Sequence, residues 1–142
     1  MLVFKEGIYK STNGGATWQV YTNNSISSFL DLAIDPNNAQ ILYGTPVNSG
    51  SFAGKSSDGG VSWTTTELPT GSLYVNPVDS NIVYSVGLLG VEISLDGGNT
   101  VNGIGPSLPS NTAMRGFPLG FAIDTSNYNT LYLAADGVYK YY

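Results

Sequence analysis

Short apolar runs recur along the whole chain, and residues that favour turns separate them. Runs of this kind, bounded by glycine, proline, asparagine or aspartate, are typical of β-strands. No apolar stripe with i, i+3, i+4 spacing continues for more than about one helical turn before a glycine interrupts it. The pattern therefore predicts an all-β chain, with strands at residues 8–10, 18–21, 29–34, 41–44, 51–55, 62–66, 71–75, 81–85, 90–94, 120–123, 130–133 and 137–140.

One of these runs is apolar at nearly every position. Residues 29–34 read Phe-Leu-Asp-Leu-Ala-Ile, with a single polar interruption at Asp31. A nearly continuous apolar run indicates a strand that is covered on both of its faces. We therefore expect residues 29–34 to form a buried inner strand.

A second pattern, Ser-x-Asp-Gly-Gly-x-x-Trp, joins pairs of predicted strands. Its clearest copy contains Ser56, Asp58, Gly60 and Trp63. Asp-Gly between β-prone segments predicts a hairpin, because glycine adopts positive φ without steric cost. The aspartate and serine side chains can accept hydrogen bonds from nearby backbone amides and so close the turn. Two further copies contain Ser11, Asn13, Gly15 and Trp18, and Ser94, Asp96 and Gly98.

The carboxylates of these hairpins are candidates for catalysis or for capping of the turn. Catalytic residues seldom recur in register in every repeat, whereas structural residues must, so we interpret the hairpin residues as structural. The third copy has Val101 at the position of the tryptophan. We therefore expect the third unit to pack less tightly at this point.

The strands and hairpins follow one order, which we describe as strands A to D. A Pro- or Asn-containing turn joins A to B, and the hairpin joins C to D. Successive hairpins are roughly 40 residues apart, a period typical of four-stranded propeller blades. The sequence thus predicts a β-propeller of antiparallel four-stranded blades, with about three and a half blades in this chain. The expected units of this single domain are residues 1–28, 29–70, 71–118 and 119–142.

The hairpin pattern, with Ala-Ile-Asp-Pro and Leu-Tyr in the preceding strands, resembles the Asp-box (BNR) repeats of β-propellers. Such repeats occur in sialidases, sortilin-type receptors, xyloglucan-degrading glycoside hydrolases and photosystem II assembly factors. The resemblance implies the fold but not the chemistry, because these families share the repeat alone. If the resemblance extended to sialidases, it would imply three arginines that bind the substrate. This chain has only one arginine, Arg115. A xyloglucanase-like site would need two facing carboxylates, and no convincing pair is left once the repeated ones are assigned to turns.

Composition narrows the possible functions further. Only 11% of the residues are charged, the net charge is −5, and the chain has neither cysteine nor histidine. So few basic residues argue against binding of nucleic acid or anionic membranes. Disulfides and thiolate metal sites are excluded, and we expect no cofactor, no metal and no catalytic residue in this chain. No apolar run approaches the length of a membrane span. The uncharged polar surface suggests a secreted or cell-surface protein.

A ligand is expected on the face opposite the hairpins, where loops do not repeat. The candidate loops are residues 22–28, 45–50, 66–70, 87–90 and 102–119. The longest contains Arg115 and Phe117, which could form a cation–aromatic platform for a sugar or a peptide. The alternative is that Phe117 fills the gap beside Val101 and that Arg115 is merely solvated.

Two functional hypotheses follow. The first is a non-catalytic propeller module that binds glycan or protein or serves as a scaffold. The second is a segment of a xyloglucanase-like glycoside hydrolase whose catalytic carboxylates lie partly outside this chain. The two ends of the chain repeat the same part of a blade, so an arc of this kind either continues into further blades or associates with other chains.

Overall fold

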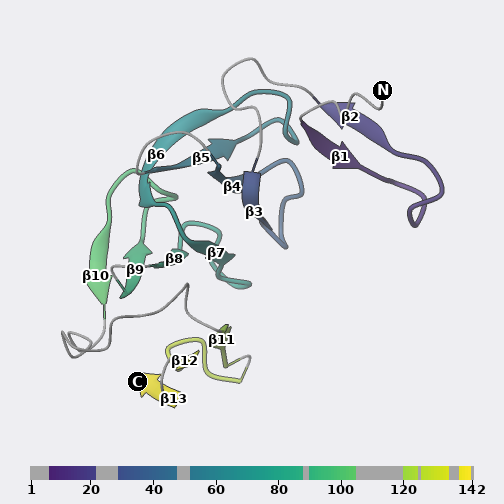
Figure 1. The fold of residues 1–142 in the computed structure, drawn as a ribbon. Helices are drawn as coiled ribbons and strands as arrows, with labels where there is room; N and C mark the ends of the chain where they lie inside the picture. The colour runs from purple at the N-terminus through teal and green to yellow at the C-terminus, as the bar shows by residue number, and fades with distance from the viewer. Residues whose placement is uncertain are drawn as a thin grey trace.

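The computed structural model describes residues 7–21, 29–47, 52–87, 90–104, 120–124, 126–134 and 138–141 (Figure 1). Every regular element in these ranges is a β-strand, which confirms the all-β prediction. The described part of the chain contains no helix that is long and apolar enough to cross a membrane. The strands are β1 (Ile8–Lys10), β2 (Gln19–Tyr21), β3 (Phe29–Ile34), β4 (Leu42–Pro46), β5 (Phe52–Ser56), β6 (Thr64–Pro69), β7 (Ser72–Val75), β8 (Val83–Gly87), β9 (Gly90–Ser94), β10 (Asn102–Ile104), β11 (Gly120–Ile123), β12 (Leu131–Ala134) and β13 (Val138–Tyr141).

The strands form antiparallel sheets in which spatial order follows chain order. Two sheets have four strands, β3-β4-β5-β6 and β7-β8-β9-β10. A three-stranded sheet contains β11-β12-β13, and β1 pairs with β2. In both four-stranded sheets the Gly-Gly hairpin joins the third and fourth strands, as predicted. This meander of four antiparallel strands is the blade of a β-propeller. The number of blades and the limits of the units stay predictions.

The core lies between the two four-stranded sheets. Its buried cluster combines Ala33, Tyr43, Ala53 and Leu68 of the first sheet with Leu73 and Val83 of the second. Hydrogen bonds also cross this interface. The Tyr43 hydroxyl donates to the Gly97 carbonyl at 3.1 Å, and the Leu73 amide donates to Asp31 Oδ2 at 2.8 Å. Apolar packing and backbone-directed polar contacts therefore fix how one sheet stacks on the next.

The next interface along the chain repeats this arrangement. The Phe121 ring lies 4.7 Å from the Tyr74 ring and 5.4 Å from the Tyr84 ring, between centroids. Phe121 stands three residues before the turn residue Asp124, and Leu73 stands three residues before the turn residue Asn76. The same position of the inner strand thus enters the preceding sheet in both cases.

The prediction that residues 29–34 are buried on both faces is wrong. On one face of β3, Ala33 is buried and Asp31 reaches β7. The side chains of the other face are 62% exposed at Leu30, 41% at Leu32 and 57% at Ile34. Alternation along the strand explains the split, because only one face has another sheet of the described strands against it.

Four of the predicted loops begin inside strands: 45–50 in β4, 66–70 in β6, 87–90 at the last residue of β8, and 102–119, which contains all of β10. Thr45 lies in β4 and donates its hydroxyl hydrogen to the Gly71 carbonyl at 2.6 Å. Thr66 lies in β6 and donates to the Ala53 carbonyl at 2.9 Å, and Leu68 of β6 is fully buried. The predicted ligand-binding loops at residues 45–50 and 66–70 are therefore partly core strand.

The prediction that the third unit packs less tightly at Val101 is also wrong. Val101 is partly buried and packs against the core cluster. Trp63 is partly buried and stacks on Phe29, with ring centroids 4.6 Å apart. Trp18, in the first copy, is 59% exposed. Packing at this position therefore follows the neighbouring sheet rather than the size of the side chain.

Candidate functional site

The Gly-Gly hairpins, which we call the capped hairpins (residues 11–18, 56–63 and 94–101), share one network of hydrogen bonds. In the second hairpin, Ser56 Oγ donates to Asp58 Oδ1 at 2.8 Å and accepts from the Gly60 amide at 2.9 Å. Asp58 Oδ1 also accepts from the Val61 and Ser62 amides at 3.0 and 2.8 Å. The second oxygen, Oδ2, accepts from the Ser62 hydroxyl. Both carboxylate oxygens are thus used within the turn.

The other two capped hairpins reproduce these contacts. Asp96 Oδ1 accepts from the Asn99 and Thr100 amides at 3.0 and 2.8 Å, and Oδ2 accepts from the Thr100 hydroxyl. In the first hairpin, Asn13 Oδ1 accepts from the Thr17 amide at 2.9 Å, and Asn13 Nδ2 donates to the Thr17 hydroxyl at 2.8 Å. The second glycine has positive φ in every copy: 91° at Gly15, 99° at Gly60 and 96° at Gly98.

The hydrogen bonds make the hairpin carboxyl groups unusually acidic. The Ser62 hydroxyl, followed by the Ser62 amide and Ser56, lowers the pKa of Asp58 to about 2. Thr100 and Ser94 lower the pKa of Asp96 to about 2 in the same way. A general acid or base works best with a pKa near the operating pH, so these carboxylates are poor proton-transfer groups. Their geometry suits acceptors that organise a turn.

The opposite end of the sheet presents apolar side chains. Phe52 begins β5 and pairs across the sheet with Pro69, whereas Lys55 pairs with Thr64 next to the hairpin. Phe52 precedes Ser56 by four steps along the strand, which is about 13 Å. Phe52 is 44% exposed and Val47 is 43% exposed. Arg115 and Phe117, the ligand residues expected from the sequence, lie outside the described residues, as does the loop at 22–28.

The sequence pattern did not lead us to Phe52, although a comparison of the three hairpin copies marks this position as unusual. It stands four residues before the serine of its capped hairpin, and the corresponding residues of the other two copies are Gly7 and Gly90. A large aromatic residue in place of a glycine is a departure from the repeat. Such departures on the loop side are candidates for function.

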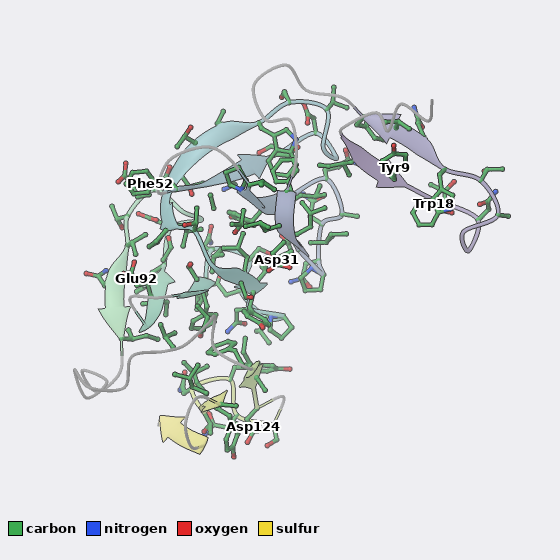
Figure 2. The ribbon with its side chains drawn as sticks, in the orientation of Figure 1. Tyr9, Trp18, Asp31, Phe52, Glu92 and Asp124 are labelled. Carbon is green, nitrogen blue, oxygen red and sulfur yellow. The ribbon has the colours of Figure 1, made fainter. Side chains whose placement is uncertain are left out.

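Asp31 is a second departure from the repeat. It lies on the inner strand β3, where the corresponding residue of β7 is Ser72. Figure 2 shows Asp31 toward β7, consistent with the hydrogen bond from the Leu73 amide. Tyr74 is next to it, and burial, followed by the charge of Asp31, raises the pKa of Tyr74. Asp31 is a carboxylate that is not used in a turn and is partly exposed.

The remaining buried polar and aromatic side chains that we considered stabilise the fold. Asp35 is 1% exposed in the turn between β3 and β4, where its Oδ1 accepts from the Asn37 amide at 2.8 Å. Tyr43 and Tyr84, at one repeated position, are buried packing residues. Among the described residues, no three acidic side chains converge to hold a metal ion.

Solved structures similar to this chain are propeller enzymes. No protein-family model and no curated protein sequence matches the chain. An ancestral GH74 enzyme superposes with a TM-score of 0.77 at 24% identity, over 96% of this chain and 20% of that one. The Niastella koreensis GH74 enzyme gives 0.70 at 23% identity, over 96% and 25%. The Xanthomonas campestris GH74 xyloglucanase gives 0.73 at 14% identity, over 96% and 26%.

These similarities establish the fold. At such identities they show that the chain folds as part of a β-propeller, which confirms the predicted architecture. The chain spans between 20% and 26% of the length of these three enzymes.

Proposed function

We propose that this chain is a segment of an Asp-box β-propeller, on a secreted or cell-surface protein, that binds a glycan without cleaving it. The observation that carries the proposal is the use of both oxygens of Asp58 and of Asp96 within their own turns. The glycan would therefore bind to the opposite face, where Phe52 and Val47 are exposed.

An exposed phenylalanine beside a proline suits a sugar ring. The axial C–H groups of a pyranose form a flat apolar surface that packs on an aromatic face, while its hydroxyls stay solvated. Phe52 and Pro69, which pair across the sheet, supply such a surface at its loop end, and the exposed Val47 follows the end of β4. Only 11% of the chain is charged and the net charge is −5, which favours a neutral polysaccharide over an acidic one. The similarity to an enzyme named as a xyloglucanase makes xyloglucan the first glycan to test. Protein binding and a purely structural role are the alternatives.

The second candidate function is that of a glycoside hydrolase segment. Asp31 favours it, because it is a carboxylate outside the turns, on an inner strand facing the next sheet. Glycoside hydrolysis generally needs two carboxyl groups, so Asp31 would work with a partner supplied by residues beyond those described.

One assay separates these functions. Wild type, Phe52→Ala and the control Val61→Ala are run in gels containing xyloglucan, and released reducing ends are measured in parallel. Val61 is 56% exposed, apolar and on the hairpin side, so its loss should leave binding unchanged. We expect Phe52→Ala to weaken binding about tenfold, equivalent to about 1.4 kcal/mol, with no release of reducing ends.

Two results of this assay would contradict binding of a glycan without cleavage. Equal retardation of Phe52→Ala and wild type would remove the glycan surface proposed here. Release of reducing ends by wild type but not by Asp31→Asn would favour the hydrolase.

A further inference from the structure

Asp35, in the turn between β3 and β4, is a buried carboxylate whose two oxygens differ in their surroundings. Its side chain is 1% exposed, and Oδ1 accepts a hydrogen bond from the Asn37 amide at 2.8 Å. Oδ2 is also buried, and no described residue donates a hydrogen bond to it. A buried carboxylate is destabilising unless its charge is compensated and its oxygens accept hydrogen bonds. Asp35 therefore requires a cation nearby and a hydrogen-bond donor for Oδ2.

The second four-stranded sheet has a neutral side chain at the same position. Asn76 begins the turn after β7 as Asp35 begins the turn after β3, and the backbone amide of each closes its turn in the same way. Burial raises the pKa of Tyr84, and a hydrogen bond with the Asn76 side chain acts in the opposite direction. An ionised carboxylate has no hydrogen to donate. Asp35 therefore cannot donate to Tyr43, the counterpart of Tyr84, as an asparagine would.

The residue opposite this tyrosine changes together with the turn residue. In three sheets, the turn residue, the tyrosine and the residue opposite it are Asp35, Tyr43 and Lys55; Asn76, Tyr84 and Ile93; and Asp124, Tyr132 and Lys140. Aspartate in the turn thus occurs with lysine in the third strand of the sheet, and asparagine occurs with isoleucine. This pairing of residue types within one chain indicates that the two positions interact.

Lys55 lies on the same face of its sheet as Asp35. Ala33 is opposite Tyr43, and Tyr43 is opposite Lys55. Because side chains alternate along a strand, Asp35, two residues after Ala33, shares their face. Ala33 and Tyr43 belong to the core cluster between the two four-stranded sheets, so Asp35 and Lys55 both face the second sheet.

The polar groups on this face gather at one carbonyl of the third capped hairpin. Lys55 Nζ donates to the Gly97 carbonyl at 2.9 Å and lies 5.3 Å from the centroid of the Tyr43 ring. The Tyr43 hydroxyl donates to the same carbonyl at 3.1 Å. Burial, followed by the charges of Asp35 and Asp96, raises the pKa of Tyr43 to about 12. The Asp35 carboxylate therefore acts on the same hydroxyl that the Lys55 ammonium group accompanies.

We propose that Asp35 and Lys55 act as one charge pair, joined through a buried water molecule, that fixes the third capped hairpin to the first four-stranded sheet. The water donates one hydrogen bond to Asp35 Oδ2 and one to the Tyr43 hydroxyl oxygen, and it accepts one from Lys55 Nζ. Three polar partners are typical of a buried water. Lys55 compensates the charge of Asp35 while it holds Gly97. The second sheet, with its neutral turn residue, needs neither the cation nor the water. The charge pair is independent of the proposed glycan site.

A double-mutant cycle tests the charge pair, because the second sheet supplies the matched replacement for each member. Urea unfolding is measured for wild type, Lys55→Ile, Asp35→Asn and the double variant. We expect Lys55→Ile to raise the unfolding equilibrium constant about tenfold to a hundredfold, since it leaves a buried acceptor uncompensated. Asp35→Asn alone should change this constant by less than about threefold, because asparagine can donate to Tyr43. The double variant should recover most of the stability that Lys55→Ile loses.

Lys10→Ile is the control for Lys55→Ile. Lys10 also directly precedes a capped hairpin, but it is opposite Gln19. The fold-changes of Lys10→Ile and Asp35→Asn should therefore multiply in their double variant, as they do for independent sites. If the fold-changes of Lys55→Ile and Asp35→Asn multiply in the same way, the charge pair is overturned.

Hydrogen exchange tests whether the pair holds the third capped hairpin. In Lys55→Ile the backbone amides of residues 94–101 should exchange faster than in wild type, whereas those of the first capped hairpin, residues 11–18, should be unchanged. Unchanged exchange in residues 94–101, or an equal increase in both hairpins, would show that Lys55 does not fix the third one.

A crystal structure of the chain tests the water directly. We expect one ordered water within hydrogen-bond distance of Asp35 Oδ2, the Tyr43 hydroxyl and Lys55 Nζ, and no water there in Asp35→Asn. A direct contact between the Asp35 carboxylate and the Lys55 ammonium group would overturn the bridging water, as would an Oδ2 with no water beside it.

Discussion

Truncation of Leu68 to alanine is expected to destabilise the chain by about 2–5 kcal/mol, the range for large-to-small changes in a packed core. Leu68 has no exposed surface and lies in the cluster that joins the two four-stranded sheets. Its loss leaves a cavity between the sheets, because Tyr43 and Val83 are fixed by their own strands and cannot collapse into it. Urea unfolding followed by circular dichroism measures the change.

Leu95→Ala is the matched control for Leu68→Ala. The side chain removed is the same, but Leu95 is 60% exposed, so the free energy of unfolding should change by less than about 0.5 kcal/mol. Comparable losses for the two variants would mean that the sheets do not stack through Leu68.

Substitution of Gly98 by alanine is expected to be the second most damaging change. Gly98 has a φ of +96°, and an alanine Cβ there would lie 3.0 Å from Thr66 Cγ2 and 3.3 Å from Leu68 Cδ1. The backbone strain costs about 1–3 kcal/mol, and the displacement of Thr66 and Leu68 adds about another 1–3 kcal/mol. Thermal and urea unfolding should both report the loss.

Gly15→Ala isolates the backbone contribution. Gly15 holds the same place in the first capped hairpin with a φ of +91°, and its nearest neighbour would be Trp18 Cζ2 at 3.7 Å, an ordinary contact. Its loss of stability should be clearly smaller than that of Gly98→Ala. Equal losses would show that the third capped hairpin does not pack against the preceding sheet.

Local chemistry made the strands and hairpins predictable. Asp-Gly-Gly specifies its turn through contacts within about five residues, so Ser56 and Asp58 could be assigned from the sequence. The alternation of apolar residues likewise located most strand bounds to within about two residues. The strand order followed from the repeat.

Burial was harder to predict, because it depends on neighbours that the local pattern does not describe. Leu30, Leu32 and Ile34 belong to a typical inner strand in the sequence, yet their face of that strand is exposed in the part of the chain that the structure describes. Val101 was expected to pack loosely on account of its size, but its hairpin lies against a complete sheet. Trp18 has a larger side chain than Val101, yet it is 59% exposed.

The candidate site could be predicted only in outline. The repeat indicated which face carries the capped hairpins, and hence where a ligand would not bind. Phe52 and Asp31 became candidates because they stand at positions where the other copies have glycine and serine. Comparing the copies at every position of the strands, and not only within the hairpin motif, would have found them.

The account depends most directly on the structural role of the hairpin carboxylates. In the folded chain the pKa of Asp58 and of Asp96 is about 2, well below the ordinary range of an aspartate. A depressed folded pKa stabilises the fold above the unfolded pKa, and this contribution is lost as the pH falls through the folded pKa. The stabilisation should therefore disappear between about pH 4 and pH 2.

The decisive measurement is the urea midpoint of wild type and of the double variant Asp58→Asn, Asp96→Asn, from neutral pH down to about pH 2. Asparagine fits the turn, as Asn13 shows, but it does not titrate. We predict a lower midpoint for the variant at neutral pH, convergence with wild type near pH 2, and unchanged xyloglucan binding in the neutral range. Equal midpoints at neutral pH, with loss of binding in the variant, would contradict the account and make the capped hairpins the functional site.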